Sequence, residues 1–124
     1  MKVLNATLHD LTQDQISALK EMGATEIENL KEVDKELFDK LSNCPSDVNE
    51  LEDLAEKLID IVVGYDVTHF PIGSPAFMFI VAETLPDFIR VIFSHSNRVS
   101  EEIKKSDGSI EKRQTFKFEK FIEL

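Results

Sequence analysis

Cysteine is nearly absent from this chain of 124 residues, and its apolar runs are short. The single cysteine, Cys44, excludes an internal disulfide framework and offers no set of zinc ligands. No apolar run approaches the roughly 20 residues of a membrane helix, so we expect no membrane association. The N-terminus enters a strand pattern directly, without the charged and hydrophobic regions of a signal peptide. We therefore expect a cytoplasmic protein.

Motifs for metals, cofactors and nucleophilic serines are missing as well. The three histidines, His9, His69 and His95, are far apart and lack the HxxH or aspartate-rich spacing of a metal site. No glycine-rich loop ends in the Lys-Ser/Thr pair of a P-loop, and the Gly-x-Ser-x-Gly motif of a nucleophile elbow is absent. We expect no metal and no cofactor.

Positive charge is scarce in the first half of the chain. Residues 1–64 carry six basic and fifteen acidic side chains, whereas residues 88–120 carry eight basic and five acidic ones. The whole chain has a net charge of −10, and such a field does not attract long DNA or RNA. A small anionic ligand in a local pocket of the basic half is compatible with this pattern.

The apolar periodicity predicts a single α/β domain. The fold class expected is a compact Rossmann-like three-layer fold, with a mainly parallel central sheet and a C-terminal antiparallel β-hairpin. Strands are predicted at residues 2–8, 26–30, 65–70 and 88–93, and hairpin strands at 99–105 and 110–121 around Asp107-Gly108. Helices are predicted after Thr12, over 35–41, from Ser46 or Asp47 to Gly64, and from Pro75 to Pro86.

Two of these elements have an unusual composition. The helix after Pro75 is apolar nearly all round over residues 76–82, so we expect it to be sandwiched or to lie at a subunit interface. His69 lies on a short strand beside Phe70, where a packed or hydrogen-bonded core histidine is expected.

Two segments with chemically active side chains follow predicted strands. Gly73, Ser74 and Pro75 form a strand-to-helix turn, and a helix N-terminus favours an anion. Residues 94–98 are predicted to form a polar loop in which Arg98 clamps a phosphate. We expect the amides ahead of Pro75 and the Arg98 guanidinium to line one anion site. An ordinary capped turn and a solvated polar loop also fit these residues.

The order and spacing of several segments resemble a known family. The segments are residues 9–15 (HDLTQDQ), 41–45 (LSNCP), 66–79 with Gly73 and Ser74, 93–98 (FSHSNR), and 106–121 with the terminal hairpin. Together they resemble the small standalone ring nucleases with a CARF-like (CRISPR-associated Rossmann fold) domain, which are accessories of type III CRISPR systems.

The resemblance implies one CARF-like domain over residues 1–124 that forms a homodimer and binds cyclic oligoadenylate, with cyclic tetra-adenylate as the first candidate. It implies metal-independent attack of a ligand ribose 2′-OH on the adjacent phosphate, which opens the ring and switches off type III CRISPR antiviral signalling. It implies catalytic roles for Ser74, His95, Arg98 and His9. The implied ligand contacts come from Asp10, Gly73, Ser74, Pro75, Phe77, Ser94, Ser96, Asn97 and Arg98.

One departure leaves other functions open. Residues 71–75 carry no charged side chain, so the chain could bind the ring without cutting it. The alternatives are a non-catalytic sensor or sponge for this or another nucleotide, and a protein-interaction domain that pairs through the apolar helix.

Overall fold

The computed structural model describes all 124 residues, and a five-stranded sheet forms its centre. The strand order is β2-β1-β3-β4-β5, in which β2, β1, β3 and the start of β4 are parallel and β5 is antiparallel to β4. The expected α/β class, with a mainly parallel sheet and a C-terminal hairpin, is confirmed. The strands are β1 (Lys2–Asn5), β2 (Glu26–Asn29), β3 (Val67–Phe70), β4 (Arg90–Lys104) and β5 (Ile110–Glu123).

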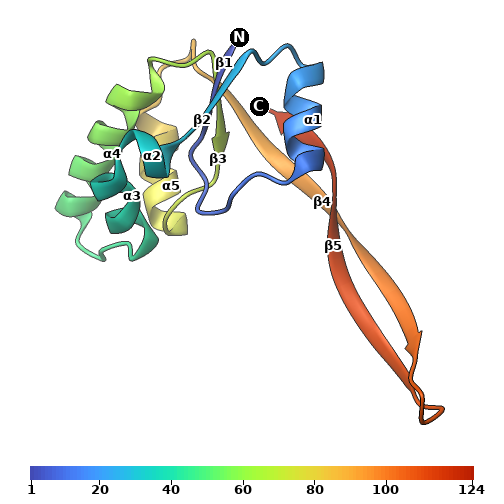
Figure 1. Ribbon diagram of the computed structural model, residues 1–124. Coiled ribbons are helices and arrows are strands. Elements are labelled where there is room, and N and C mark those ends of the chain that lie inside the picture. Colours follow the sequence, from blue (N-terminus) through green and yellow to red (C-terminus); the bar gives the residue numbers. More distant parts are fainter.

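Helices cover both faces of the sheet (Figure 1). One face carries only α1 (Gln13–Glu21), and the other carries α2 (Leu30–Val33), α3 (Lys35–Ser42), α4 (Val48–Val62) and α5 (Pro75–Thr84). The larger apolar cluster joins the sheet to α3, α4 and α5, and a smaller one of Val3, Leu19, Val67 and Ile92 lies under α1. None of the helices combines the length and the apolar character that crossing a bilayer requires.

Local sequence signals set the ends of α1. The Thr12 hydroxyl accepts a hydrogen bond from the backbone N–H of Gln15, whose side-chain oxygen accepts one from the backbone N–H of Thr12. This reciprocal capping satisfies two donors that the first turn of a helix leaves open. Gly23, just after the helix, has a φ of 104°, a conformation that glycine adopts without strain.

The structure corrects the prediction for residues 94–98. They form no loop, because β4 continues without a break to Lys104 and pairs with β5 along its whole outer length. These residues are polar because the strand is exposed to solvent here, and not because they form a loop. The fourth strand also begins at Arg90, two residues later than predicted, and Phe88 before it is exposed.

The outer part of β4 and β5, residues 97–118, projects beyond the edge of the sheet as a two-stranded ribbon (Figure 1). We call this segment the arm. Nearly all of its residues are exposed, and no helix covers either of its faces. The arm leaves the body at the carboxyl edge of the parallel strands, which is where ligands bind in folds of this class.

Candidate functional site

A cleft of about 300 Å³ opens at the carboxyl edge of the parallel strands. It lies between the connection that follows β1 and the connection that follows β3. Its lining consists of residues 7–10, Gln15, residues 69–73 and Ser94. Three separate parts of the chain therefore meet at one edge of the sheet.

Asn5, at the end of β1, is the centre of a buried polar network beneath the cleft. Only 2% of this residue is exposed. Its side-chain oxygen accepts from the backbone N–H of Thr7 at 3.3 Å, and its amide nitrogen donates to the backbone carbonyl of His9 at 2.9 Å. A backbone N–H can only donate and a carbonyl can only accept, so these two bonds fix the orientation of the amide.

The fixed amide determines where the proton of His69 lies. His69 Nδ1 is 3.1 Å from Asn5 Oδ1, which is an acceptor, so Nδ1 carries the hydrogen. In the neutral ring Nε2 is then free to accept, and it is 2.8 Å from the hydroxyl oxygen of Ser94. Ser94 therefore donates its proton to His69.

Gln15 completes the chain of hydrogen bonds. Its side-chain oxygen is held by the N–H of Thr12, so its amide nitrogen is the donor in the 3.0 Å contact with Ser94 Oγ. A serine hydroxyl has one proton and two acceptor positions. His69 takes the proton and Gln15 takes one acceptor position, which leaves one acceptor position on an oxygen that lines the cleft.

Burial keeps His69 uncharged. The side chain lies beneath the cleft against Phe121, in an edge-to-face contact with 5.3 Å between ring centroids. Removing the imidazole from water disfavours its charged form and lowers the pKa of His69 to about 4. At neutral pH the ring is therefore a proton acceptor whose unprotonated Nε2 accepts the hydrogen bond of Ser94.

This pKa predicts how stability depends on pH. Unfolded His69 takes up a proton near pH 6.5, whereas the folded ring does so only near pH 4. Between these values the unfolded state binds more protons, so the free energy of unfolding falls as the pH falls from about 6.5 towards 4. We expect a loss on the order of 3 kcal/mol. Urea unfolding between pH 7 and pH 4.5 measures this loss, and His69→Gln should remove it. An equal pH dependence in both proteins would contradict the assignment.

The turn after β3 presents unpaired backbone donors. The N–H groups of Ile72 and Gly73, both of which line the cleft, find no acceptor within the chain. Gly73 has a φ of 75°, and a Cβ at this position would lie 3.0 Å from Cδ2 of Phe77. Both the backbone conformation and the lack of space require glycine here. The turn is therefore a compact site with free N–H groups, which suits an oxyanion or a carbonyl oxygen.

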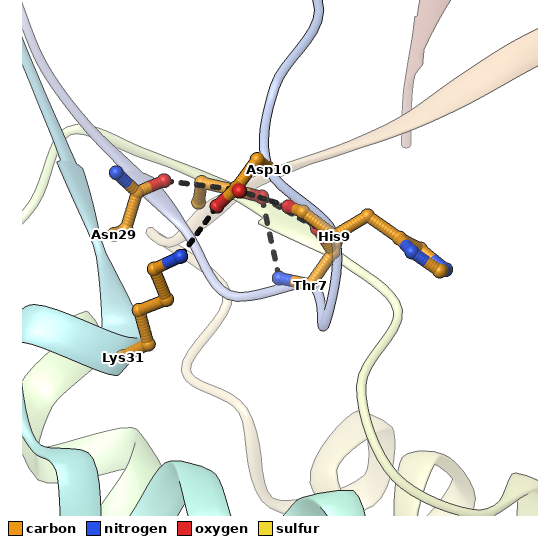
Figure 2. Close-up of polar contacts among 6 residues, drawn as sticks. Thr7, His9, Asp10, Asn29 and Lys31 are labelled. Atoms are coloured by element: carbon orange, nitrogen blue, oxygen red, sulfur yellow. Dashed lines mark hydrogen bonds and ion pairs between the residues drawn. The ribbon is translucent and has the colours of Figure 1, made fainter.

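The connection after β1 supplies the outer rim of the cleft. Asp10 accepts from Lys31 Nζ at 2.7 Å, and Figure 2 shows this ion pair. Thr7, His9 and Asn29, which the same figure labels, each form a hydrogen bond with Asn5. The imidazole of His9 points away from these contacts. Because Asp10 neutralises Lys31, and the lining contains no lysine or arginine, the cleft itself offers no free lysine or arginine cation.

At the turn after β3, three residues predicted to contact the ligand lie outside the cleft lining. Ser74 caps α5, where its hydroxyl accepts from the N–H of Phe77 and donates to Cys44 Sγ. Pro75 begins the helix behind that cap. The side chain of Phe77 is completely buried in the larger apolar cluster. The sequence identified this strand-to-helix turn correctly, but it assigned the contacts to residues whose side chains stabilise the turn from below.

Residues 94–98 divide between the two faces of β4. Side chains alternate along a strand, so Ser94, Ser96 and Arg98 share the face of the cleft and α1, whereas His95 and Asn97 lie on the opposite face. His95 is 3.5 Å from Glu119 there. Arg98 lies on the arm, with its guanidinium 5.6 Å from the centre of the Phe116 ring. The expected convergence of Arg98 with the amides of the turn is therefore not seen in the single chain, and only Ser94 of this segment lines the cleft.

Three residues of the network, Asn5, Gln15 and His69, had no functional role in the sequence-based prediction. His69 is the core histidine that the sequence predicted, with 3% of its surface exposed, but its Nε2 also contacts the serine of the cleft. Gln15 was recognised only as part of the helix cap. A signal for His69 exists in the strand alternation, because residues 67 and 69 of β3 and residues 92 and 94 of β4 face the same side.

Comparison with known proteins gives one match. A family model described as the uncharacterized protein MJ1673 family matches residues 1–122, so the chain belongs to this family. No curated protein and no solved structure matches the chain.

Proposed function

We propose that this member of the MJ1673 family binds cyclic oligoadenylate over the cleft and opens the ring by metal-independent transesterification. The proposal is supported above all by the hydroxyl of Ser94, which keeps one acceptor position towards the cleft and donates its proton to an uncharged histidine. Such a pair accepts a proton from a ligand hydroxyl and needs no protein nucleophile. The ribose 2′-OH of RNA-like ligands supplies that hydroxyl.

The chemistry then proceeds by proton transfer through Ser94. The ribose 2′-OH donates to Ser94 Oγ and passes its proton to this oxygen, while the serine proton moves to Nε2 of His69. The 2′-oxygen forms a bond to the adjacent phosphorus, and the bond from phosphorus to the 5′-oxygen breaks. The leaving 5′-oxygen takes a proton from water at the mouth of the cleft, where His9 also lies. The products end in a 2′,3′-cyclic phosphate and a 5′-OH.

The environment of the site indicates slow turnover. A histidine whose pKa lies near 4 is a weak base, and general base catalysis is most efficient when the pKa lies near the working pH. The N–H groups of Ile72 and Gly73 are the donors available to a phosphoryl oxygen, and no cation assists them inside the cleft. An enzyme that switches off a signal by degrading the signalling molecule needs only a low turnover rate.

A ring larger than the cleft would extend along the adjacent face of β4. Ser96 and Arg98 lie on this face, and Arg98 is about 13 Å from Ser94 at the usual rise of a strand. We infer that the guanidinium contacts the second phosphate of a bound ring rather than the first. A homodimer around the two-fold axis of the ring would present the same face to each half of the ligand.

Replacing Arg98 by alanine tests this placement. We expect Arg98→Ala to weaken binding of cyclic tetra-adenylate by about 10- to 100-fold, because a charge-assisted hydrogen bond contributes about 1.5–3 kcal/mol. Asn97→Ala, one residue away but on the opposite face, is the matched control and should bind normally. Titration with a fluorescent ligand measures both. Equal affinity in the two variants would remove Arg98 from the site.

Incubation of the chain with radiolabelled cyclic tetra-adenylate in the presence of EDTA tests the proposed activity. A linear product that ends in a cyclic phosphate is the expected result. A ligand that is bound but intact would favour the sensor or sponge, a role that the absence of a cation from the cleft also fits. A ligand that is neither bound nor cut would contradict both the nuclease and the sensor or sponge. The remaining alternative would then be a protein-interaction domain.

A further inference from the structure

The arm lacks the packing that normally stabilises a two-stranded ribbon. Its strands pair only with each other over residues 97–118, and an isolated two-stranded hairpin is marginally stable in water. Apolar side chains on it face solvent, with Ile110 63% and Phe116 71% exposed. A surface of this kind gains stability when another molecule covers it.

The charge of the arm is opposite to the charge of the body. The arm carries six basic and four acidic side chains, whereas the remainder of the chain carries eight basic and twenty acidic ones. Directly paired residues share one face of a hairpin. The pairs Lys104–Ile110 and Glu102–Lys112 therefore place two lysines, an isoleucine and one glutamate on the same face near the tip. Neither Lys104 nor Lys112 forms an ion pair within the chain.

An acidic groove, opposite in charge to the arm, lies between α4 and α5. It encloses about 440 Å³, and the half-buried side chains of Ile59 and Ile80 form its apolar part. Its charged lining is entirely acidic, and none of these carboxylates is paired within the chain. The acidic residues are Glu52, Glu56, Asp60 and Glu83.

We propose that the tip of the arm docks into the α4–α5 groove of a second copy of this chain. The lysines of the tip meet unpaired carboxylates, and Ile110 meets the apolar part of the groove. Because each copy has both an arm and a groove, a reciprocal exchange about a two-fold axis forms two identical contacts and closes the dimer. The proposal does not depend on the ligand of the cleft.

Charge reversal on each side of the contact tests the docking. Lys104→Glu/Lys112→Glu reverses the tip, and Glu56→Lys/Asp60→Lys reverses the groove. Sedimentation equilibrium of the full chain without ligand should show a dimer of the 14.1 kDa subunit. Either double variant alone should raise the dimer dissociation constant by about 30-fold or more, because like charges then face each other. The matched control, Arg113→Glu/Lys117→Glu, makes the same change on the opposite face of the arm and should change it by less than about threefold.

Mixing the two reversed proteins gives the decisive result. In the mixture an acidic tip meets a basic groove and a basic tip meets an acidic groove, so an equimolar mixture should form heterodimers with restored affinity. The proposal is overturned by a monomeric wild type at about 100 μM, by reversed variants that dimerise normally, or by a mixture that stays monomeric. A monomeric chain that instead binds a single-stranded oligonucleotide through Lys104 and Lys112 would also overturn it.

Discussion

His69→Gln is expected to slow the opening of cyclic tetra-adenylate by about 10²- to 10⁴-fold, the range that removal of a general base produces. The amide oxygen of glutamine can still accept the hydrogen bond of Ser94, but it cannot take up a proton at neutral pH. Because His69 is only 3% exposed and lies beneath Ser94, binding should stay within about threefold of wild type. Single-turnover kinetics and ligand titration separate the two effects.

A matched control is available on the neighbouring strand. His95 is exposed and lies on the opposite face of β4 from Ser94, so His95→Gln should leave the single-turnover rate unchanged. The pH profile gives a second test, because the pKa of His69 is about 4. The rate should be flat through neutral pH and fall only in acid. An inflection near pH 6.5, the ordinary value for histidine, would indicate an exposed histidine as the base instead.

Phe77→Ala is expected to lower the free energy of unfolding by about 3–5 kcal/mol, which is the usual cost of truncating a fully buried phenylalanine. Its ring is completely inaccessible and packs in the larger apolar cluster beneath the turn at Gly73. The loss includes both the transfer of the ring and the cavity that it leaves. Chemical denaturation measures it, and the melting temperature should fall by about 10–20 °C.

Phe79 provides the control on the same helix. It is 75% exposed, so Phe79→Ala should change the unfolding free energy by no more than about 0.5 kcal/mol. A small effect at Phe77 together with impaired ligand binding would restore the original assignment of Phe77 as a ligand contact. A large effect at Phe79 would indicate that another subunit covers this side chain in solution.

Elements with strong local signals were predicted well from the sequence. The capping residues of α1, the glycine after it and the leucine periodicity of α4 depend on interactions between residues that are close in sequence. The hairpin turn at Asp107 and Gly108 is of the same kind. Such signals predict the same local structure in any fold, because the interacting residues lie within one helical turn or one hairpin turn of each other.

Residues 94–98 show where this reasoning fails. Their polar composition indicates a loop only if no partner strand is available, and the partner, residues 116–121, lies some twenty positions further along the chain. The continuous strand then decides which side chains face the cleft and moves Arg98 onto the arm. The same limit applied to Phe77, whose apolar neighbours on α5 give no indication of which side is buried.

The amino-acid order by itself determined the α/β class, the principal helix boundaries and the edge of the sheet at which polar side chains collect, because these follow from local hydrogen bonding and from periodic burial. Only the tertiary structure decided that Asn5, His69 and Ser94 form one chain of hydrogen bonds. These residues come from three different strands, so their side chains meet only when the sheet is assembled, whereas the backbone groups that orient the Asn5 amide are local.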